Sequence, residues 1–104
     1  MARVRVCALS DLSEGEVKDV SADPPVAIYL IDGGVYATGN VCTHEYSLLS
    51  DGYVEGDRIE CQLHFAQFCI RTGAALVAPA TAPIATYPVS VEGDDVFIDF
   101  PEPA

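Results

Sequence analysis

The sequence predicts an all-β fold, an antiparallel β-sandwich or barrel, and three observations support it. The apolar segments are short, the longest wholly apolar run being the six residues Val26 to Ile31, whereas helices usually need about ten or more. No stretch keeps helical periodicity over several turns. Gly, Asp and Pro separate the segments, as they do at the turns of antiparallel proteins. Residues 1–104 are predicted to form one domain around a single core.

The first half of the chain is predicted to hold four strands, at Val4 to Ala8, Glu16 to Val20, Val26 to Ile31 and Val35 to Thr38. Asp32-Gly33-Gly34 separates the last two. Asp and Gly accept the positive φ angles of tight hairpin turns, so these two strands are expected to pair as a hairpin.

The second half is predicted to hold two hairpins and one further strand. The first hairpin is punctuated by Asp51-Gly52 and Glu55-Gly56-Asp57 and leads through Arg58 to Glu60. The strand Phe68 to Arg71 and the final hairpin, Ile84 to Val91 and Val96 to Phe100, come after it.

The charge balance limits the classes of partner. Sixteen Asp and Glu against five Lys and Arg give a net charge of −11, which would be repelled by the phosphates of a nucleic acid. The same charge would steer the protein toward basic patches on other proteins, although solubility alone could explain most of it. The acidic runs Asp11 to Glu16 and Glu92 to Asp95 are predicted to be solvated turns.

No feature of the sequence predicts a membrane partner. Crossing a bilayer takes about 20 apolar residues, and the longest apolar run here has six. The N-terminus, Met1 to Arg5, does not lead into the apolar core of a signal peptide. We therefore expect a cytoplasmic location. Separately, the protein is expected to be a monomer.

Two cysteine and histidine pairs carry the functional information. They are Cys42-Thr43-His44 and Cys61-Gln62-Leu63-His64, with sixteen residues between them, and they contain both histidines of the chain. In an extended loop, side chains at i and i+2 project to the same side, so Cys42 and His44 can reach one centre together. Metal ligation is the first hypothesis.

The order of these ligands distinguishes two kinds of metal site. Structural zinc sites usually group like ligands, two Cys and then two His, whereas here the two kinds are interleaved. A binuclear cluster suits interleaving, because each loop can send its Cys to one iron and its His to the other. This is the ligand set of a Rieske [2Fe–2S] centre.

With this motif the chain resembles the Rieske ferredoxins of bacterial aromatic-ring dioxygenase systems over nearly its whole length. The family's ligand motif is matched by Cys42, His44, Cys61 and His64. Weaker matches lie at Tyr36-Ala37, Arg71-Thr72-Gly73 and the segment from Pro79 to Pro83. The resemblance implies the Rieske version of the antiparallel fold, in which a small cluster-binding subdomain carries the ligands on two loops.

The resemblance also implies a function. A ferredoxin of this kind binds one [2Fe–2S] cluster, takes single electrons from an NAD(P)H-dependent flavoprotein reductase and passes them to a terminal Rieske oxygenase, without making bonds itself. One alternative is a small Rieske subunit of a nitrite-reductase-type enzyme. The other, from a different class, is a structural zinc-binding interaction module.

The same resemblance implies that the outer edges of His44 and His64 reach the surface, where an electron can leave. Four residues near them are the candidates for partner contact: Glu45, Leu63, Phe65 and Pro79. Leu63 and Phe65 could instead only shield the cluster from water.

The two other cysteines are expected to be free thiols, because disulfides are rare in reducing compartments. Alternation in Gln67 to Arg71 places Cys69 opposite Phe68 and Ile70, so Cys69 is predicted to be partly exposed. The same rule places Cys7 on one strand face with Arg3 and Arg5.

The sequence predicts a reduction potential near the lower end of the Rieske span of roughly −150 to +300 mV. High-potential Rieske proteins have a second Cys in each loop, which together form a disulfide, and a serine after the second ligand His. The corresponding positions here hold Ser47, Leu63 and Ala66, and fewer hydrogen bonds leave the added electron less stabilised. A potentiometric titration should give this low midpoint, with little pH dependence around neutrality, and a midpoint well above zero would contradict the prediction.

Overall fold

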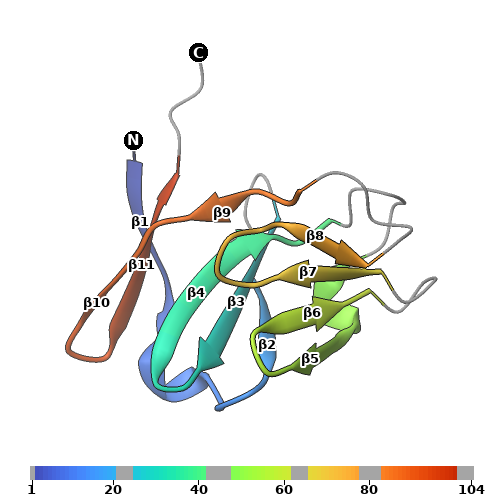
Figure 1. The fold of residues 1–104 in the computed structure, drawn as a ribbon. Helices are drawn as coiled ribbons and strands as arrows, with labels where there is room; N and C mark the ends of the chain where they lie inside the picture. Colours follow the sequence, from blue (N-terminus) through green and yellow to red (C-terminus); the bar gives the residue numbers. More distant parts are fainter. Residues whose placement is uncertain (1, 21–24, 42–47, 62–65, 78–82, 101–104) are drawn as a thin grey trace.

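The computed structural model describes residues 2–20, 25–41, 48–61, 66–77 and 83–100, and these form three antiparallel sheets (Figure 1). The first sheet has the order β1-β11-β10, formed by Ala2–Ala8, Asp95–Phe100 and Val89–Glu92. The second has the order β2-β3-β4-β9, formed by Val17–Val20, Val26–Ile31, Gly34–Gly39 and Thr86–Tyr87. The third has the order β5-β6-β7-β8, formed by Tyr53–Glu55, Arg58–Glu60, Gln67–Cys69 and Ala75–Val77. The all-β antiparallel prediction is confirmed.

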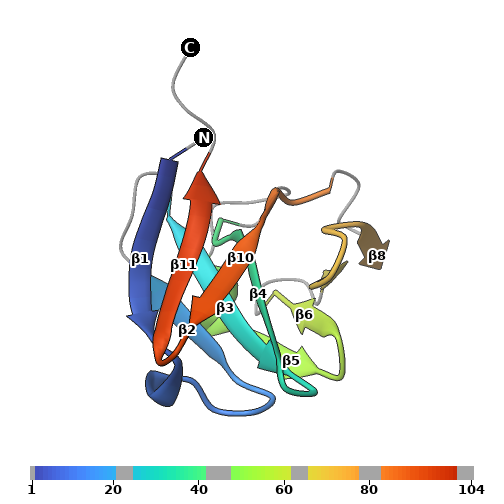
Figure 2. The same cartoon turned by 90° about the vertical axis from the view of Figure 1, so that its left-hand side faces the viewer.

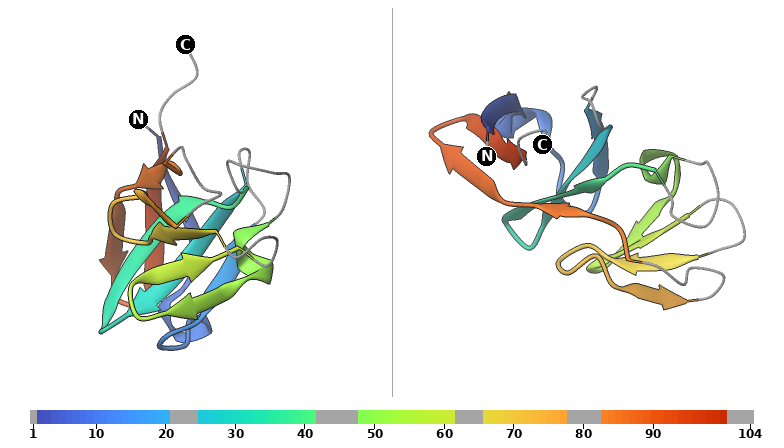
Figure 3. Two further views of the ribbon diagram at one scale, coloured as in Figure 1. Left: turned by 45° about the vertical axis from the view of Figure 1, so that its right-hand side comes forward. Right: turned by 90° about the horizontal axis from the view of Figure 1, so that it is seen from above.

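The second sheet lies between the other two. Figure 2 shows the first sheet in front of it, and the view from above in Figure 3 shows the first and third sheets on opposite sides of it. Its strand β3 alternates between two cores: Val26 and Ile28 pack in the core shared with Ile98 of the first sheet. Ala27 and Tyr29 pack in the core shared with the third sheet. Because both faces of β3 are covered, the strand is apolar throughout.

The β3–β4 hairpin forms as the sequence predicts. β3 pairs with β4 along its whole length, and the turn has positive φ angles at Asp32 (51°) and Gly33 (78°). The carboxylate of Glu14 accepts hydrogen bonds from the N–H groups of both turn residues, at 2.7 and 2.9 Å. The acidic run Asp11 to Glu16 is mostly exposed, as predicted, but Glu14 also caps a turn.

The prediction of a single strand from Ile84 to Val91 is wrong. The segment is divided into β9, which pairs with β4 in the second sheet, and β10, which pairs with β11 in the first. The division falls at Pro88, which has no N–H group for a sheet hydrogen bond. Its carbonyl still accepts a bond from the N–H of Asp99, at 3.0 Å. Pro88 is thus the point at which the chain crosses from one sheet to another.

Four further elements differ from the prediction. The strand predicted at Phe68 to Arg71 ends at Cys69, because Ile70 and Arg71 form a turn. Strand β8 was not predicted, and neither were two short 3₁₀ helices, Leu9–Asp11 and Leu49–Asp51. Across the described ranges, no helix has the length and apolarity that crossing a bilayer requires.

Cys7 does not share a face with Arg3 and Arg5, contrary to the alternation prediction. The register of β1 against β11 shifts between Arg5 and Cys7, and such a bulge inserts one residue that breaks the period of two. Cys7 is therefore buried, at 5% exposure, whereas both arginines are exposed. Arg5 pairs with Asp95, at 2.7 Å, on the outer face.

Gly73 joins the end of β7 to the segment that leads into β9. Its N–H donates to the carbonyl of Cys69, at 2.7 Å, and its own carbonyl accepts from the N–H of Ile84, at 2.9 Å. Gly73 has a φ of +79°, and a Cβ there would overlap the Ile84 carbonyl oxygen. This position therefore requires glycine for both its backbone angle and its space.

Gly73→Ala is expected to lower the free energy of unfolding by about 3 kcal/mol, the sum of left-handed strain and overlap with a backbone atom. The matched control is Gly93→Ala, because Gly93 has a φ of +60° and a Cβ added there would meet no atom within 4 Å. The control should cost only about 1 kcal/mol. Urea unfolding of the two cluster-loaded variants measures the difference, and equal losses would show that the Ile84 contact does not matter.

Candidate metal centre

The hairpin of β6 and β7 carries the second cysteine and histidine pair. The N–H of Cys61 donates to the carbonyl of Ala66, at 2.7 Å, and this bond closes the loop of residues 62–65. Cys61 and Ala66 are both fully buried, in the core that also contains Phe68. The Cys61 thiol forms no disulfide. A buried thiol at the start of a closed loop is available to a metal rather than to solvent.

The first pair lies in a loop whose two ends are held together. Val41 and Leu48 form an antiparallel bridge across residues 42–47. Next to this bridge, the N–H of Leu49 donates to the carbonyl of Asn40, at 2.7 Å. The Leu49 side chain is fully buried in the same core as Cys61.

The two loop stems also touch through their backbones. A Cβ at Gly52, which follows the first loop, would overlap the carbonyl oxygen of Glu60, which precedes Cys61. Only glycine permits so close an approach. The exit of the first loop and the entry of the second are therefore neighbours, as a shared metal centre requires.

Most of the predicted site residues lie outside the described residues. These are the ligands Cys42, His44 and His64, the docking candidates Glu45, Leu63, Phe65 and Pro79, and Ser47. The part of the chain that the structure describes contains no group of three or more His, Cys, Asp or Glu side chains placed to hold a metal. Of the four predicted ligands, only Cys61 is described.

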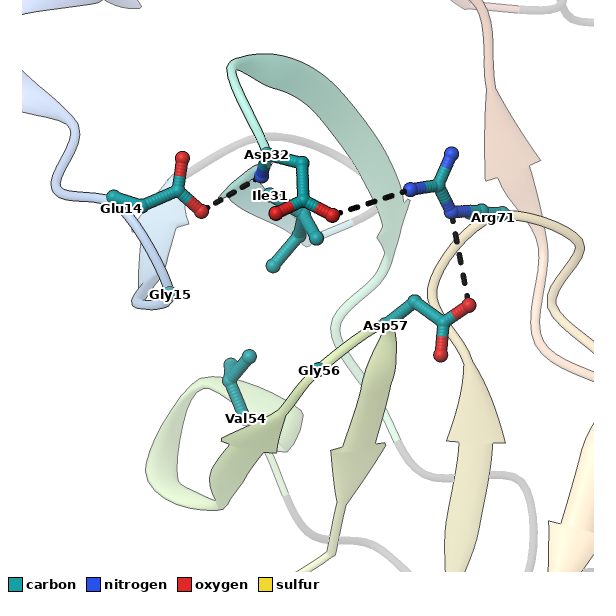
Figure 4. Close-up of a pocket in the computed structure, with 8 residues that line it drawn as sticks. All are labelled: Glu14, Gly15, Ile31, Asp32, Val54, Gly56, Asp57 and Arg71. Atoms are coloured by element: carbon teal, nitrogen blue, oxygen red, sulfur yellow. Dashed lines mark hydrogen bonds and ion pairs between the residues drawn. The ribbon is translucent and has the colours of Figure 1, made fainter.

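Arg71 links the ligand-bearing third sheet to the second sheet. This link is not predicted from the sequence. Its Nη1 donates to the Tyr36 hydroxyl, at 2.7 Å, and its guanidinium lies 5.0 Å from the centroid of that ring. Figure 4 shows Arg71 between the carboxylates of Asp32 and Asp57, which are 4.0 and 3.7 Å away. Tyr36 and Asp32 belong to the β3–β4 hairpin, and Asp57 to the turn between β5 and β6.

The Tyr36 contact is the stronger part of this link. The Asp32 side chain is 88% exposed and that of Arg71 44%, and exposed ion pairs contribute only about 0–1 kcal/mol. The hydrogen bond and the ring contact hold the guanidinium in one place. The available signal in the sequence was that Tyr36 and Arg71 both fall in segments matching one family.

Cys69 is half-buried at the end of β7, so the prediction of partial exposure is confirmed. Burial raises the pKa of its thiol, but hydrogen bonds from the Thr72 hydroxyl and from the backbone N–H groups of Thr72 and Arg71 outweigh that effect. The pKa of Cys69 therefore lies below its ordinary value. For Cys7, burial dominates and raises the pKa of the thiol.

Comparison with known proteins now identifies the family. Residues 2–88 match the model of the Rieske [2Fe-2S] domain. The 3-phenylpropionate/cinnamic acid dioxygenase ferredoxin subunit of Shigella flexneri serotype 5b (strain 8401) is 46% identical over 103 residues, covering 98% of this chain and 97% of that protein. The chain belongs to the Rieske [2Fe–2S] ferredoxins of aromatic-ring dioxygenase systems.

Solved Rieske ferredoxins have the same fold. The Sphingomonas yanoikuyae B1 ferredoxin is 42% identical, with a TM-score of 0.91, over 96% of this chain and all of its own. The ferredoxin in a complex of reduced oxygenase and oxidised ferredoxin of carbazole 1,9a-dioxygenase is 35% identical, with a TM-score of 0.88, over 92% of this chain and 91% of that one. The predicted Rieske fold is thus confirmed.

Membership of this family settles the cofactor and the class of activity. A Rieske ferredoxin binds one [2Fe–2S] cluster and carries electrons as a component of a multicomponent dioxygenase, whose catalytic steps take place on other subunits. A zinc-binding module and a nitrite-reductase subunit find no support among these relatives. The described residues fit the cluster. The thiol of Cys61, a position that the ligand motif requires, is shielded from solvent, and the stems of the two ligand loops are in contact beside it.

Cys69 is expected to be the first thiol of the cluster-loaded protein to react with iodoacetamide. The thiolate is the reactive form, so its lowered pKa should move the half-maximal labelling rate to a lower pH than that of a free cysteine. Cys7, buried and with a raised pKa, should react only on unfolding. Mass spectrometry of labelled peptides across a pH series measures both rates.

Thr72→Val is the matched control for this prediction. It removes the hydroxyl that donates to the Cys69 sulfur while leaving the backbone donors in place. The labelling midpoint of Cys69 should rise toward higher pH. An unchanged midpoint, or labelling of Cys7 at the same rate, would contradict the assignment.

Proposed function

We propose that Cys42, His44, Cys61 and His64 are the four ligands of one [2Fe–2S] cluster. In this assignment each loop contributes one thiolate and one neutral imidazole. The single described ligand, Cys61, supports it, because its thiol is fully buried and its loop is closed by the Ala66 carbonyl. Cluster assembly then releases the thiol protons, since only thiolates bind iron.

The cluster would supply reversible one-electron chemistry when bound. The protein's part is to hold the ligands in place, so that reorganisation on electron transfer stays small. Both loops begin and end on paired strands or on residues hydrogen-bonded across the loop base. Two thiolates rather than four leave the oxidised centre near neutral, which raises its potential above that of a four-cysteine cluster. Within the Rieske range, the absence of a side-chain hydroxyl at Ala66 fits a carrier in the lower part.

The partners proposed are an NAD(P)H-dependent flavoprotein reductase, which donates electrons, and the terminal oxygenase of an aromatic-ring dioxygenase, which receives them. Similarity along 98% of the chain to a 3-phenylpropionate/cinnamic acid dioxygenase ferredoxin subunit is the observation that carries this proposal. It also makes an oxygenase for that substrate the first one to test. The net charge of −11 favours basic docking patches on both partners.

The docking surface proposed surrounds the ligand histidines and includes Glu45, Leu63, Phe65 and Pro79. The protein is proposed to act as a single-domain monomer in the cytoplasm, where the pyridine nucleotide is available. A monomer suits a carrier that must dissociate from one partner before it meets the next.

Electron delivery to the oxygenase tests the proposal. The reduced protein is mixed with oxidised oxygenase in a stopped-flow instrument, and reoxidation is followed by absorbance at low and high salt. The rate should fall with rising ionic strength, because screening weakens the attraction of unlike charges. No reoxidation by any aromatic-ring oxygenase would contradict the proposed role.

Single variants then test the docking surface. Leu63→Ala and Phe65→Ala should each slow transfer at limiting concentration by about fivefold or more, the equivalent of ~1 kcal/mol lost at an interface. Val91→Ala is the matched control, because Val91 is 41% exposed on β10, in the first sheet. Rates equal to those of the control would show that Leu63 and Phe65 do not contribute to docking.

A further inference from the structure

Asn40 is one of two fully buried polar side chains among the described residues, and both its amide oxygen and its amide nitrogen are hydrogen-bonded. Its Oδ1 accepts from the N–H of Ser50, at 2.8 Å. Its Nδ2 donates to the Asp19 carboxylate, at 2.9 Å, and to the Ser50 hydroxyl, at 3.0 Å. The Ser50 N–H fixes the orientation of the amide, because that donor requires the oxygen to face it.

These bonds surround the base of the first ligand loop. Asn40 lies two residues before Cys42, and Ser50 follows the short bridge that closes the loop at Leu48. The backbone of Asn40 adds two bonds, because its carbonyl accepts from Leu49 and its N–H donates to the carbonyl of Pro25. Asn40, which follows β4, is therefore hydrogen-bonded to β2, to the residue before β3 and to the 3₁₀ helix Leu49–Asp51.

The other fully buried polar side chain in the described ranges, Thr38, provides an internal comparison. Its hydroxyl donates to the carbonyl of Gly39, at 2.9 Å, so the Tyr29 hydroxyl must donate to it, at 2.8 Å. Tyr29 belongs to β3, and Gly39 to β4 with Thr38 itself. Thr38 is as fully buried as Asn40, and its hydroxyl is also hydrogen-bonded. Neither of its two bonds reaches across a ligand loop.

We propose that Asn40 is a positioning residue for the cluster, and that the Asp19–Asn40–Ser50 network fixes the geometry of the loop carrying Cys42 and His44. The proposal rests on the ligand assignment given above. Removing the amide leaves the Ser50 N–H without its acceptor and breaks the side-chain bonds that join Asp19, Asn40 and Ser50, so that only backbone contacts still hold the base of the loop. The loop then samples several arrangements, and the ligands on it do the same.

The first test compares Asn40→Ala with Thr38→Val in the cluster-loaded protein. Asn40→Ala removes three side-chain hydrogen bonds and Thr38→Val removes two, and both variants should reduce stability because polar partners are left unpaired. Only Asn40→Ala should broaden the EPR spectrum of the reduced cluster and shift its midpoint potential. It should also accelerate cluster loss to an iron chelator by about tenfold, the equivalent of ~1.4 kcal/mol.

The second test exchanges the two polar groups. Asn40→Asp alone places two carboxylates against each other, whereas Asn40→Asp combined with Asp19→Asn restores a donor opposite an acceptor at unchanged net charge. The double variant should recover most of the narrow EPR line that Asn40→Asp loses. Its midpoint potential should stay below that of the parent, because the negative charge has moved to a buried position beside the ligand loop.

The outcomes separate this inference from the proposed function. If the parent protein binds no Rieske cluster, the ligand assignment itself fails. If the parent binds the cluster but Asn40→Ala and Thr38→Val give the same EPR line width and the same rate of cluster loss, Asn40 has only a structural role. Failure of the double variant to improve on Asn40→Asp would likewise overturn the positioning role.

Discussion

The structure depends on burying both faces of one strand. β3 must supply one row of side chains to the core beneath the first sheet and the other row to the core beneath the third. This double burial places the second sheet in the middle and holds the ligand-bearing sheet against a rigid base. Hydrophobic burial on each face supplies the stabilisation, and Arg71 adds a polar link from the third sheet to Tyr36 at the edge of the same contact.

The described part of the candidate metal centre is built onto the core. Cys61 and Leu49 are fully buried in the core that β3 shares with the third sheet, and Gly52 brings the stems of the two ligand loops into backbone contact. Packing therefore fixes Cys61 and the bases of both ligand loops. This arrangement suits electron transfer, which needs a donor and an acceptor state of almost the same geometry. Chemical selectivity toward an aromatic compound is not needed in such a molecule, because the oxygenase supplies it.

Many strand bounds and the type of metal centre could be predicted from local sequence patterns. The bounds of β3 and β6, the turn at Asp32 and the exposure of Cys69 follow from alternation and turn chemistry, and the interleaved ligand motif indicated a Rieske centre. Other features depend on contacts between segments distant in sequence. The bulge that buries Cys7 is set by pairing with β11, and the short strand β8 forms only because β7 provides an edge for it. The link through Arg71 and the network around Asn40 likewise require knowledge of which strands are neighbours, and a single sequence does not contain it.

The central claim is that one cysteine and one histidine from each loop hold a single binuclear cluster. Because the chain contains only two histidines, labelling histidine with nitrogen-15 allows electron–nuclear double resonance to read both without background. The reduced protein should show two distinct, strongly coupled imidazole nitrogens on a cluster that takes up one electron per chain, and replacing His64 should remove one of them. A reduced centre with one coupled imidazole nitrogen, or with none, would contradict the ligand assignment and with it the account of how this fold carries electrons.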